Sequence, residues 1–377
     1  MQLLLMIAVL ILIFSLSAAY IYRKLASFIS FYGGDPTSRT SRTVRILIAL
    51  ILGVICANMR HFSAIVVLHL IVLFLISDLI AGLLRLLFRP TKNTRFYKLL
   101  HYIHHSGVVP MAVLILLTLY GVFNMNRIDK KEYAVSTVKE INNYKIALVA
   151  DLHYDTIQSR NLVSDMLARI QLQQPDILIL AGDIVEEGTS KESMEEIFAM
   201  VGKIRPTYGC YYIYGNHDTQ PYTDHPNYTE RDLSTTIQQN GICILNDRYT
   251  EIGDDLILVG RGDAGWENNS GRKSTQEILS SLSADDREKK YIIVADHQPI
   301  ESEENASASV DLQLSGHTHA GQIWPIGHFT EMRGGLNYGI YQQGLCKVIV
   351  TSGVAGWGYP FRTQAHCEYV LVDLNKE

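Results

Sequence analysis

Two histidines stand one residue apart in the segment SGHTHAGQIW, residues 315–324, directly after the apolar-alternating run VDLQL. Residues i and i+2 of an extended segment point to the same side, so His317 and His319 can both face one cluster of ligands. Gly316 gives the backbone freedom to turn just before them. A polar loop would explain this segment alone, so partners elsewhere in the chain are needed before it indicates a site.

Four other segments supply such partners, because each is a short β-rich apolar run that ends in polar residues. The runs are KIALVADLH, DILILAGD, CYYIYGNHD and YIIVADH, and the residues at their ends are Asp151, His153, Asp183, Asn216, His217, Asp218 and His297. Helical stretches lie between the runs, which predicts α/β layers with sheets covered on both faces. In α/β sheets, ligands gather outside the carboxyl ends of the strands. The five endings together therefore predict one metal site.

The types of these residues indicate what the site could bind. Carboxylates, an amide and imidazoles suit manganese, iron or zinc. A structural zinc site would use cysteine thiolates, but the five cysteines are scattered and form no CxxC pair. Two cations that share a bridging carboxylate can clamp a phosphoryl group and lower the pKa of bound water. The ligand types therefore indicate two divalent metal ions and phosphoryl chemistry.

The first third of the chain is basic and very apolar. Residues 1–131 hold 14 Lys and Arg against 3 acidic residues, whereas the remainder holds 19 and 35. Four apolar runs lie in this part, at residues 2–21, 44–59, 64–87 and 108–124. Because about 20 apolar residues cross the hydrocarbon of a bilayer, we expect about four transmembrane helices within residues 1–131 and a soluble domain at 132–377. The acidity of that domain argues against nucleic acid as a partner.

Basic residues in the short loops predict the orientation of these spans. The first and third loops are basic, with Arg23, Lys24, Arg39 and Arg42 in one and Arg89, Lys92, Arg95 and Lys98 in the other. The second loop has only Arg60. The soluble domain is therefore expected outside the cytoplasm, beside the cell membrane. Arg127, Lys130 and Lys131 after the last span argue against this orientation, and loss of the short second span would reverse it.

Several polar residues lie within or beside the spans. Arg45 in the short second span would have to reach the head groups. His69 and Asp78 in the third span are nine positions apart, so we expect them on nearly opposite faces and in separate helix–helix contacts. Three histidines, at positions 101, 104 and 105, are expected in an interfacial loop without a metal.

The order DxH, GD, GNHD, H and GHTH, between Lys145 and the carboxy terminus, resembles that of the calcineurin-like metallophosphoesterases. The tail TSGVAGWGYPFR, with GLNYGIYQQG before it, is similar to the branch with membrane-attached bacterial members. The resemblance implies a four-layer α-β-β-α sandwich with a dinuclear metal centre. An all-α membrane region of about four transmembrane helices precedes it here and lies outside the family pattern.

The same resemblance implies a role for each polar ending. One metal ion would be held by Asp151, His153 and His319, the other by Asn216, His297 and His317, and both by Asp183 as the bridge. His217 would be the catalytic imidazole, and Asp218 would orient it through a hydrogen bond. Two neighbours are open: Asp296 is either a partner of the ligands or a strand end, and Arg362 either grips a substrate phosphate or forms a surface salt bridge.

These observations lead to the hypothesis of an integral membrane phosphoesterase. A metal-activated hydroxide would attack phosphorus in line, in a phosphoester or pyrophosphate that the membrane could deliver as a lipid-linked compound. Three alternatives are open. One is a nucleotide-sugar lipid pyrophosphatase, although such relatives act on cytoplasmic precursors. Another is a non-catalytic membrane sensor or adaptor with structural metals, and the third is a transporter or channel formed by the spans.

Overall fold

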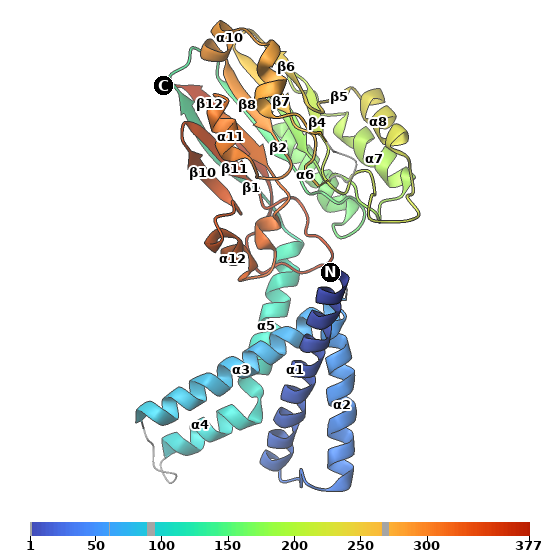
Figure 1. Ribbon diagram of the computed structural model, residues 1–377, viewed down its shortest axis with the longest axis vertical. Helices are drawn as coiled ribbons and strands as arrows, with labels where there is room; N and C mark the ends of the chain where they lie inside the picture. Colours follow the sequence, from blue (N-terminus) through green and yellow to red (C-terminus); the bar gives the residue numbers. More distant parts are fainter. Residues whose placement is uncertain (1, 60, 89–94, 266–270) are drawn as a thin grey trace. The chain divides into compact units, whose positions relative to one another are not determined.

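The computed structural model describes residues 2–59, 61–88, 95–265 and 271–377. The chain forms two compact units, Met1–Tyr120, here called the helical unit, and Gly121–Glu377, here called the α/β unit. Figure 1 shows the elements of both units, coloured along the sequence.

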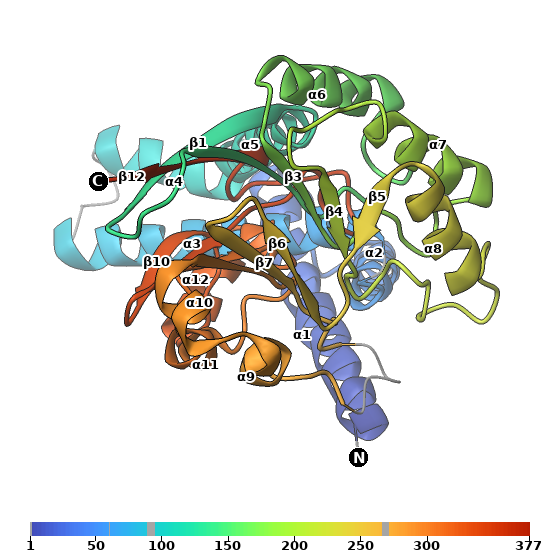
Figure 2. The same ribbon diagram turned by 90° about the horizontal axis from the view of Figure 1, so that it is seen from above.

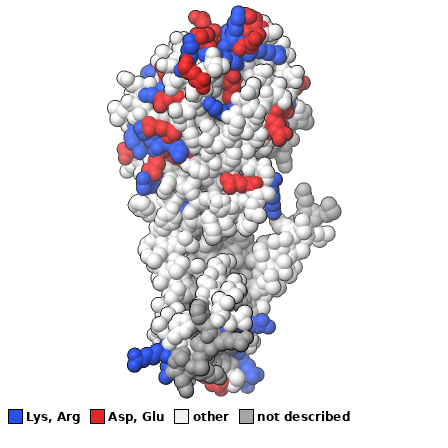
Figure 3. Space-filling model, turned by 90° about the vertical axis from the view of Figure 1, so that its left-hand side faces the viewer, with Lys and Arg blue, Asp and Glu red and all other residues white. Residues whose placement is uncertain are grey.

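The helical unit contains α1 (Gln2–Phe31), α2 (Arg39–Ala57), α3 (Phe62–Phe88), α4 (Arg95–Ser106) and most of α5 (Val108–Met125). Four of the described helices are long and apolar enough to cross a membrane: Leu4–Phe31, Arg39–Ala57, Phe62–Leu87 and Val108–Met125. They overlap the four predicted runs, but the first extends to Phe31, beyond its predicted end at residue 21. On the face shown in Figure 3, this unit is nearly free of charged side chains except near its lower end, where Lys and Arg gather.

Two basic residues of the helical unit lie in contacts between elements. Lys24 belongs to α1, not to the first loop, and its Nζ lies 2.5 Å from Asp78 Oδ1 of α3. Tyr20 OH donates to the same carboxylate at 2.8 Å. Arg45 is buried against the Tyr22 ring and donates to Tyr22 OH at 3.1 Å and to Pro36 O at 2.9 Å. Buried charges are stable where they are paired and hydrogen-bonded.

The histidines of the helical unit give one expected and one unexpected result. His69 and Asp78 are in separate contacts, as expected, because His69 Nδ1 lies 2.7 Å from Ile65 O of its own helix. The three histidines assigned to a loop lie on helix α4, so that prediction is wrong. The His104 ring lies near the Asp78 carboxylate, which also pairs with Lys24, and its Nε2 is 3.5 Å from Asp78 Oδ1.

The α/β unit is built on two six-stranded sheets (Figure 2). In spatial order, the first consists of β1 (Ile128–Thr137), β12 (Cys367–Lys376), β2 (Tyr144–Val149), β3 (Ile177–Ala181), β4 (Cys210–Ile213) and β5 (Ile242–Ile244). The second consists of β10 (Gly339–Gln343), β11 (Cys346–Val350), β9 (Leu312–Ser315), β8 (Tyr291–Ala295), β7 (Leu256–Gly260) and β6 (Arg248–Ile252). Strands β2 to β5 are parallel, as are β7, β8, β9 and β11. Their carboxyl ends therefore lie at one edge of each sheet.

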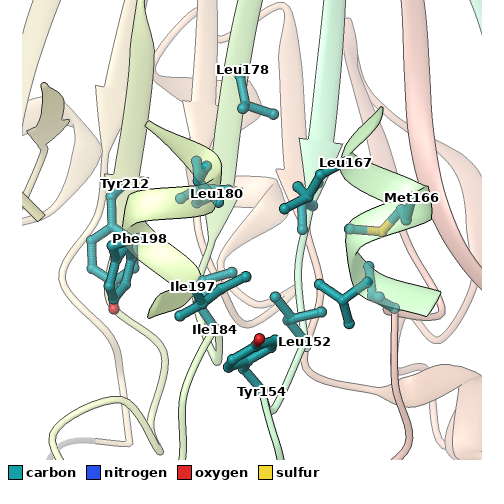
Figure 4. Close-up of a cluster of buried hydrophobic side chains, with 14 of the residues drawn as sticks. Leu152, Tyr154, Met166, Leu167, Leu178, Leu180, Ile184, Ile197, Phe198 and Tyr212 are labelled. Atoms are coloured by element: carbon teal, nitrogen blue, oxygen red, sulfur yellow. The ribbon is translucent and has the colours of Figure 1, made fainter. Parts of the chain in front are cut away.

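Apolar residues on both faces of the strands hold the layers together. In β2, Ile146 and Leu148 pack between the two sheets, whereas Ala147 and Val149 pack towards helices. The first sheet is covered by α6 (Arg160–Leu172), α7 (Lys191–Val201) and α8 (Glu230–Gln239), as Figure 4 shows in part. The second is covered by α9 (Thr275–Ile278) and α11 (Ser302–Ser307). Burial on both faces explains why these strands are continuously apolar. The predicted four-layer sandwich is confirmed.

Candidate metal centre

The predicted site residues all follow the carboxyl ends of parallel strands. Asp151 and His153 follow β2, Asp183 follows β3, Asn216, His217 and Asp218 follow β4, His297 follows β8, and His317 and His319 follow β9. Contacts between the sheets bring these ends together. The His317 amide donates to Asp151 Oδ1 at 2.9 Å, and His297 Nδ1 lies 2.8 Å from Ala181 O. The packing of the two sheets thus joins five chain segments into one cluster.

Two groups of ligand atoms form within this cluster. They are Asp151, His153 and His319 in one group and Asp183, His297 and His317 in the other, with ligand atoms within 4.8 Å of one another in each. Asp183 Oδ2 lies 3.2 Å from His297 Nε2 and 3.9 Å from His153 Nε2, so its carboxylate stands between the groups. Asn216 Oδ1 lies 3.0 Å from His317 Nδ1 and adds an oxygen to the second group. This grouping is the one that the resemblance implies.

The imidazoles have the orientation that a metal ligand needs. His297 and His319 donate from Nδ1 to backbone carbonyls at 2.8 and 3.1 Å, which leaves Nε2 of each ring as the ligand atom. His153 Nδ1 lies 3.1 Å from Glu186 Oε2, and neither of its buried ring nitrogens has a hydrogen-bond partner within the described residues. A buried nitrogen without a partner, beside carboxylates, calls for a ligand. These residues therefore fit divalent cations such as manganese, iron or zinc.

The backbone at the ligands adopts a rare conformation. Five of them have a positive φ: Asp151 (52°), His153 (42°), Asp183 (52°), His317 (71°) and His319 (48°). Residues other than glycine seldom adopt this region, and those that do concentrate at functional sites. The expected extended geometry of the histidine pair is therefore wrong, because a turn aims both rings. Gly316 is needed for space, since a Cβ there would lie 2.4 Å from Asp151 Oδ2.

His217 lies beside the ligands, but its partner differs from the expected one. Its Nδ1 is 2.8 Å from Glu187 Oε2, whereas the Asp218 carboxylate, within the described chain, binds backbone amides. Asp218 accepts from the amide of Asp183 at 2.9 Å and from that of Gly215 at 2.6 Å. The reason for this correction is that Asp218 is fully buried and faces the turn after β3. It fixes two loops to each other instead of orienting the imidazole.

Charges around His217 favour its protonated form. Burial alone would lower its pKa, but the Glu187 hydrogen bond and the Asp183 carboxylate raise the pKa above the usual value. Burial and the Asp183 charge likewise raise the pKa of Asp218 to about 6, against the effect of the amide hydrogen bonds. At His317, burial and the charge of His297 lower the pKa to about 4, which favours the neutral ring that a metal binds.

Sequence reasoning missed two acidic residues that follow the GD motif after two apolar residues. Each carboxylate faces the back of one histidine, Glu186 that of His153 and Glu187 that of His217. It also missed Trp357, whose ring centroid lies 5.5 Å from that of His217. The two adjacent glutamates in GDIVEEG are a signal for such partners, but a solvent-exposed turn has the same sequence pattern.

The two open neighbours of the ligands have structural partners. Asp296 pairs with Arg272, with Nη2 and Oδ2 2.9 Å apart. Arg362 is fully buried and donates to three backbone carbonyls, among them Ala355 O at 2.8 Å. Both readings of Arg362, a phosphate grip and a surface salt bridge, are therefore wrong. Because His319 Nδ1 shares the Ala355 carbonyl, Arg362 braces the loop that orients this ligand.

Comparison with known proteins gives consistent results. Residues 144–321 match the family model of the calcineurin-like phosphoesterases. An uncharacterized metallophosphoesterase of Campylobacter jejuni is 28% identical over 268 residues, which are 69% of this chain and 68% of that protein. Phosphodiesterase YaeI of Escherichia coli is 29% identical over 185 residues, 48% of this chain and 62% of that protein. A protein of Bos taurus named transmembrane protein with metallophosphoesterase domain is 26% identical over 242 residues, 62% of this chain and 53% of its own length.

Two of these matches thus cover less than two thirds of the relative's own length. The matched region of the family model starts at β2 and ends just after His319, so it contains all five polar strand endings. The two mixed sheets and the two ligand groups have the arrangement that the motif order implies. The α/β unit of this chain is thus similar to the calcineurin-like phosphoesterases, whose family model its residues 144–321 match.

Proposed function

We propose that this protein is a membrane-anchored enzyme whose α/β unit hydrolyses a phosphoester or pyrophosphate with two divalent cations. The observation that carries the proposal is the position of His217. The centroid of its ring lies 5.6 Å from that of His153, and its Nδ1 is held by the Glu187 carboxylate. A sensor or adaptor with purely structural metals would need no such oriented imidazole beside the ligands.

Nine residues share the proposed work at the metal centre. Seven would hold the cations: Asp151, His153 and His319 one, Asn216, His297 and His317 the other, and Asp183 both. Bound there, manganese, iron or zinc ions would supply the Lewis acidity that activates water and offsets charge on the phosphoryl oxygens. The remaining two, His217 and Asp218, would act without binding a cation.

His217 is the proposed catalytic residue. Because Glu187 holds Nδ1, Nε2 is the nitrogen that can meet a substrate. From this position the ring can stabilise charge on a phosphoryl oxygen or protonate the leaving oxygen during in-line displacement. Asp218 is a positioning residue, since it ties the loop of His217 to the loop of Asp183 through backbone amides.

Removal of metal is expected to abolish hydrolysis, and manganese is expected to restore it. The full-length protein in detergent would be treated with a chelator and assayed on an aryl monoester, an aryl diester and a pyrophosphate diester. Metal content would be measured on the same samples. Undiminished turnover by metal-free protein would contradict the proposal, whereas bound metal without turnover of any of the three esters would favour the sensor or adaptor.

The α/β unit is proposed to lie outside the cytoplasm, where a lipid-linked envelope phosphoester is a suitable substrate. Cys243 allows a direct test, because it is exposed and the other four cysteines are buried. A membrane-impermeant maleimide is expected to label Cys243 in intact cells, and the Cys243→Ser variant should stay unlabelled. Labelling that requires lysis would reverse the orientation and favour the nucleotide-sugar lipid pyrophosphatase.

A further inference from the structure

Helix α12 (Ile326–Met332) turns apolar side chains outward. Gly327 faces the protein, because a Cβ there would lie 2.4 Å from the Gln364 side chain. At about 100° per residue, Ile326, Phe329 and Met332 lie on the opposite side. All three are exposed, Met332 to 81%. A surface helix of a soluble domain normally shows the reverse pattern, with its polar side outward.

Trp324, just before this helix, extends the apolar surface. Its side chain is 61% exposed, although tryptophan usually buries most of its large ring. We call Trp324, Ile326, Phe329 and Met332 the α12 ridge. Aromatic rings with a polar edge and large aliphatic side chains are typical of surfaces that enter the interface of a bilayer.

The ridge is anchored on the segment that also holds the end of α5. The Trp324 amide donates to Thr363 Oγ1 at 3.0 Å, and the neighbouring Arg362 amide donates to Gly121 O of α5 at 3.1 Å. Asn124, in the last turn of α5, donates to Arg362 O at 3.1 Å. These residues of α5 belong to the α/β unit itself. Since α5 is a candidate span that ends at Met125, a bilayer crossed by α5 would end within the first residues of the α/β unit.

The ridge is also connected to the metal centre. Its first residue, Trp324, stands five residues after His319, and the side chain of Gln322 joins the segment between them to the rim of the site. Gln322 Oε1 accepts from the Trp357 amide at 2.8 Å, and the Trp357 ring lies beside His217. A surface that fixes the ridge therefore fixes the rim of the site as well.

We propose that the α12 ridge inserts into the bilayer interface and presents the metal centre to phosphoesters at the level of the lipid head groups. The substrate named here rests on the proposed phosphoesterase function, whereas the docking of the ridge to the bilayer does not depend on that function. We choose a lipid surface as the binding partner of the ridge because the end of α5, a candidate membrane span, belongs to the same unit.

Trp324 is a natural reporter of this docking. The sequence has three tryptophans, so a variant with Trp266→Phe and Trp357→Phe keeps Trp324 alone. In proteoliposomes of phosphatidylcholine brominated near the head group, Trp324 fluorescence is expected to be quenched relative to the same protein in unbrominated lipid. Its emission is expected to be blue-shifted relative to the protein in denaturant. Red-shifted and unquenched Trp324 emission in these vesicles would overturn the proposal. The proposal would also be overturned if this emission is accompanied by a dimer that Phe329→Glu disrupts.

Leu345 provides a matched control. It is 92% exposed in the turn before β11, and β11 is parallel to β9, so this turn lies at the edge of the sheet opposite the metal centre. A tryptophan placed there by Leu345→Trp, in a variant without the other three, is expected to be unquenched. Equal quenching at both positions would mean that the ridge has no special contact with lipid.

Activity separates docking from chemistry. The double variant Phe329→Glu and Met332→Glu is expected to lose roughly tenfold or more of its rate on an aryl phosphodiester with a long alkyl chain in vesicles. Its rate on the methyl analogue in solution should be unchanged, as should both rates in Leu345→Glu. Equal loss on both substrates would overturn the docking role. Failure of the unaltered protein to cleave either ester would count against the proposed function, and the fluorescence result would still decide on docking.

Discussion

Replacement of His217 by alanine is expected to lower the rate of phosphoester hydrolysis by about 10²–10⁴-fold, the usual contribution of a positioned acid or base. Its ring is not a member of either ligand group, and its Nδ1 is bound to Glu187. The number of bound metal ions should therefore stay the same. Steady-state kinetics on an aryl diester, together with metal analysis of the same samples by mass spectrometry, measures both quantities.

Two further variants sharpen this test. Glu187→Gln keeps a hydrogen-bond acceptor but removes the charge, so a smaller loss of roughly 10–100-fold is expected. His328→Ala removes an exposed histidine of α12 and should leave the rate on a soluble diester unchanged. Substantial turnover by His217→Ala would refute its catalytic role. Loss of metal in that variant would mean that the ring supports the ligands instead.

Asp183→Asn is expected to remove both metal ions and reduce hydrolysis below detection. The Asp183 carboxylate stands between the two ligand groups, 3.2 Å from His297 Nε2 and 3.9 Å from His153 Nε2. Its other oxygen, Oδ1, accepts from the His217 amide at 2.9 Å, so the backbone already occupies one side of the group. An uncharged amide would offer a single weak oxygen where two cations need a shared negative charge. Metal analysis by mass spectrometry gives the result directly.

The control makes the same chemical change at the other edge of the second sheet. Asp311 directly precedes β9, and its carboxylate pairs with Lys139 at 2.7 Å. Asp311→Asn should therefore retain the metal content and the activity of the unaltered protein. Circular dichroism of both variants would show that each keeps its secondary structure. A full complement of metal in Asp183→Asn would refute the bridging role.

The ligands of the metal centre could be predicted because they are marked by local patterns. Asp151 and His153, like His317 and His319, follow short apolar runs of the kind that form buried strands. Parallel strands end at a common edge, and this rule turns separate endings into one expected cluster. The four candidate spans could be predicted equally well, since the length and hydropathy of one continuous run define each of them.

Contacts made by the loops could not be predicted in the same way. Asp218 is next to His217 in sequence, and Glu187 is 30 residues away, yet Glu187 is the partner. The buried Asp218 carboxylate found backbone amide donors after β3, which no sequence pattern displays. For Arg362 the sequence leaves a phosphate grip and a surface salt bridge open, but its guanidinium is buried and donates to backbone carbonyl groups of its own loop.

The sequence by itself determined which chemical groups were available, which strands would be buried and which helices are apolar enough for a membrane. Only the tertiary structure decided that Asp183 stands between two ligand groups, that Glu187 holds His217, and that the α12 ridge stays exposed. The physical reason is that propensity and hydropathy belong to short segments, whereas these contacts join segments far apart in the chain. Their distances are set by strand order, by the packing of two sheets and by loop residues held at positive φ.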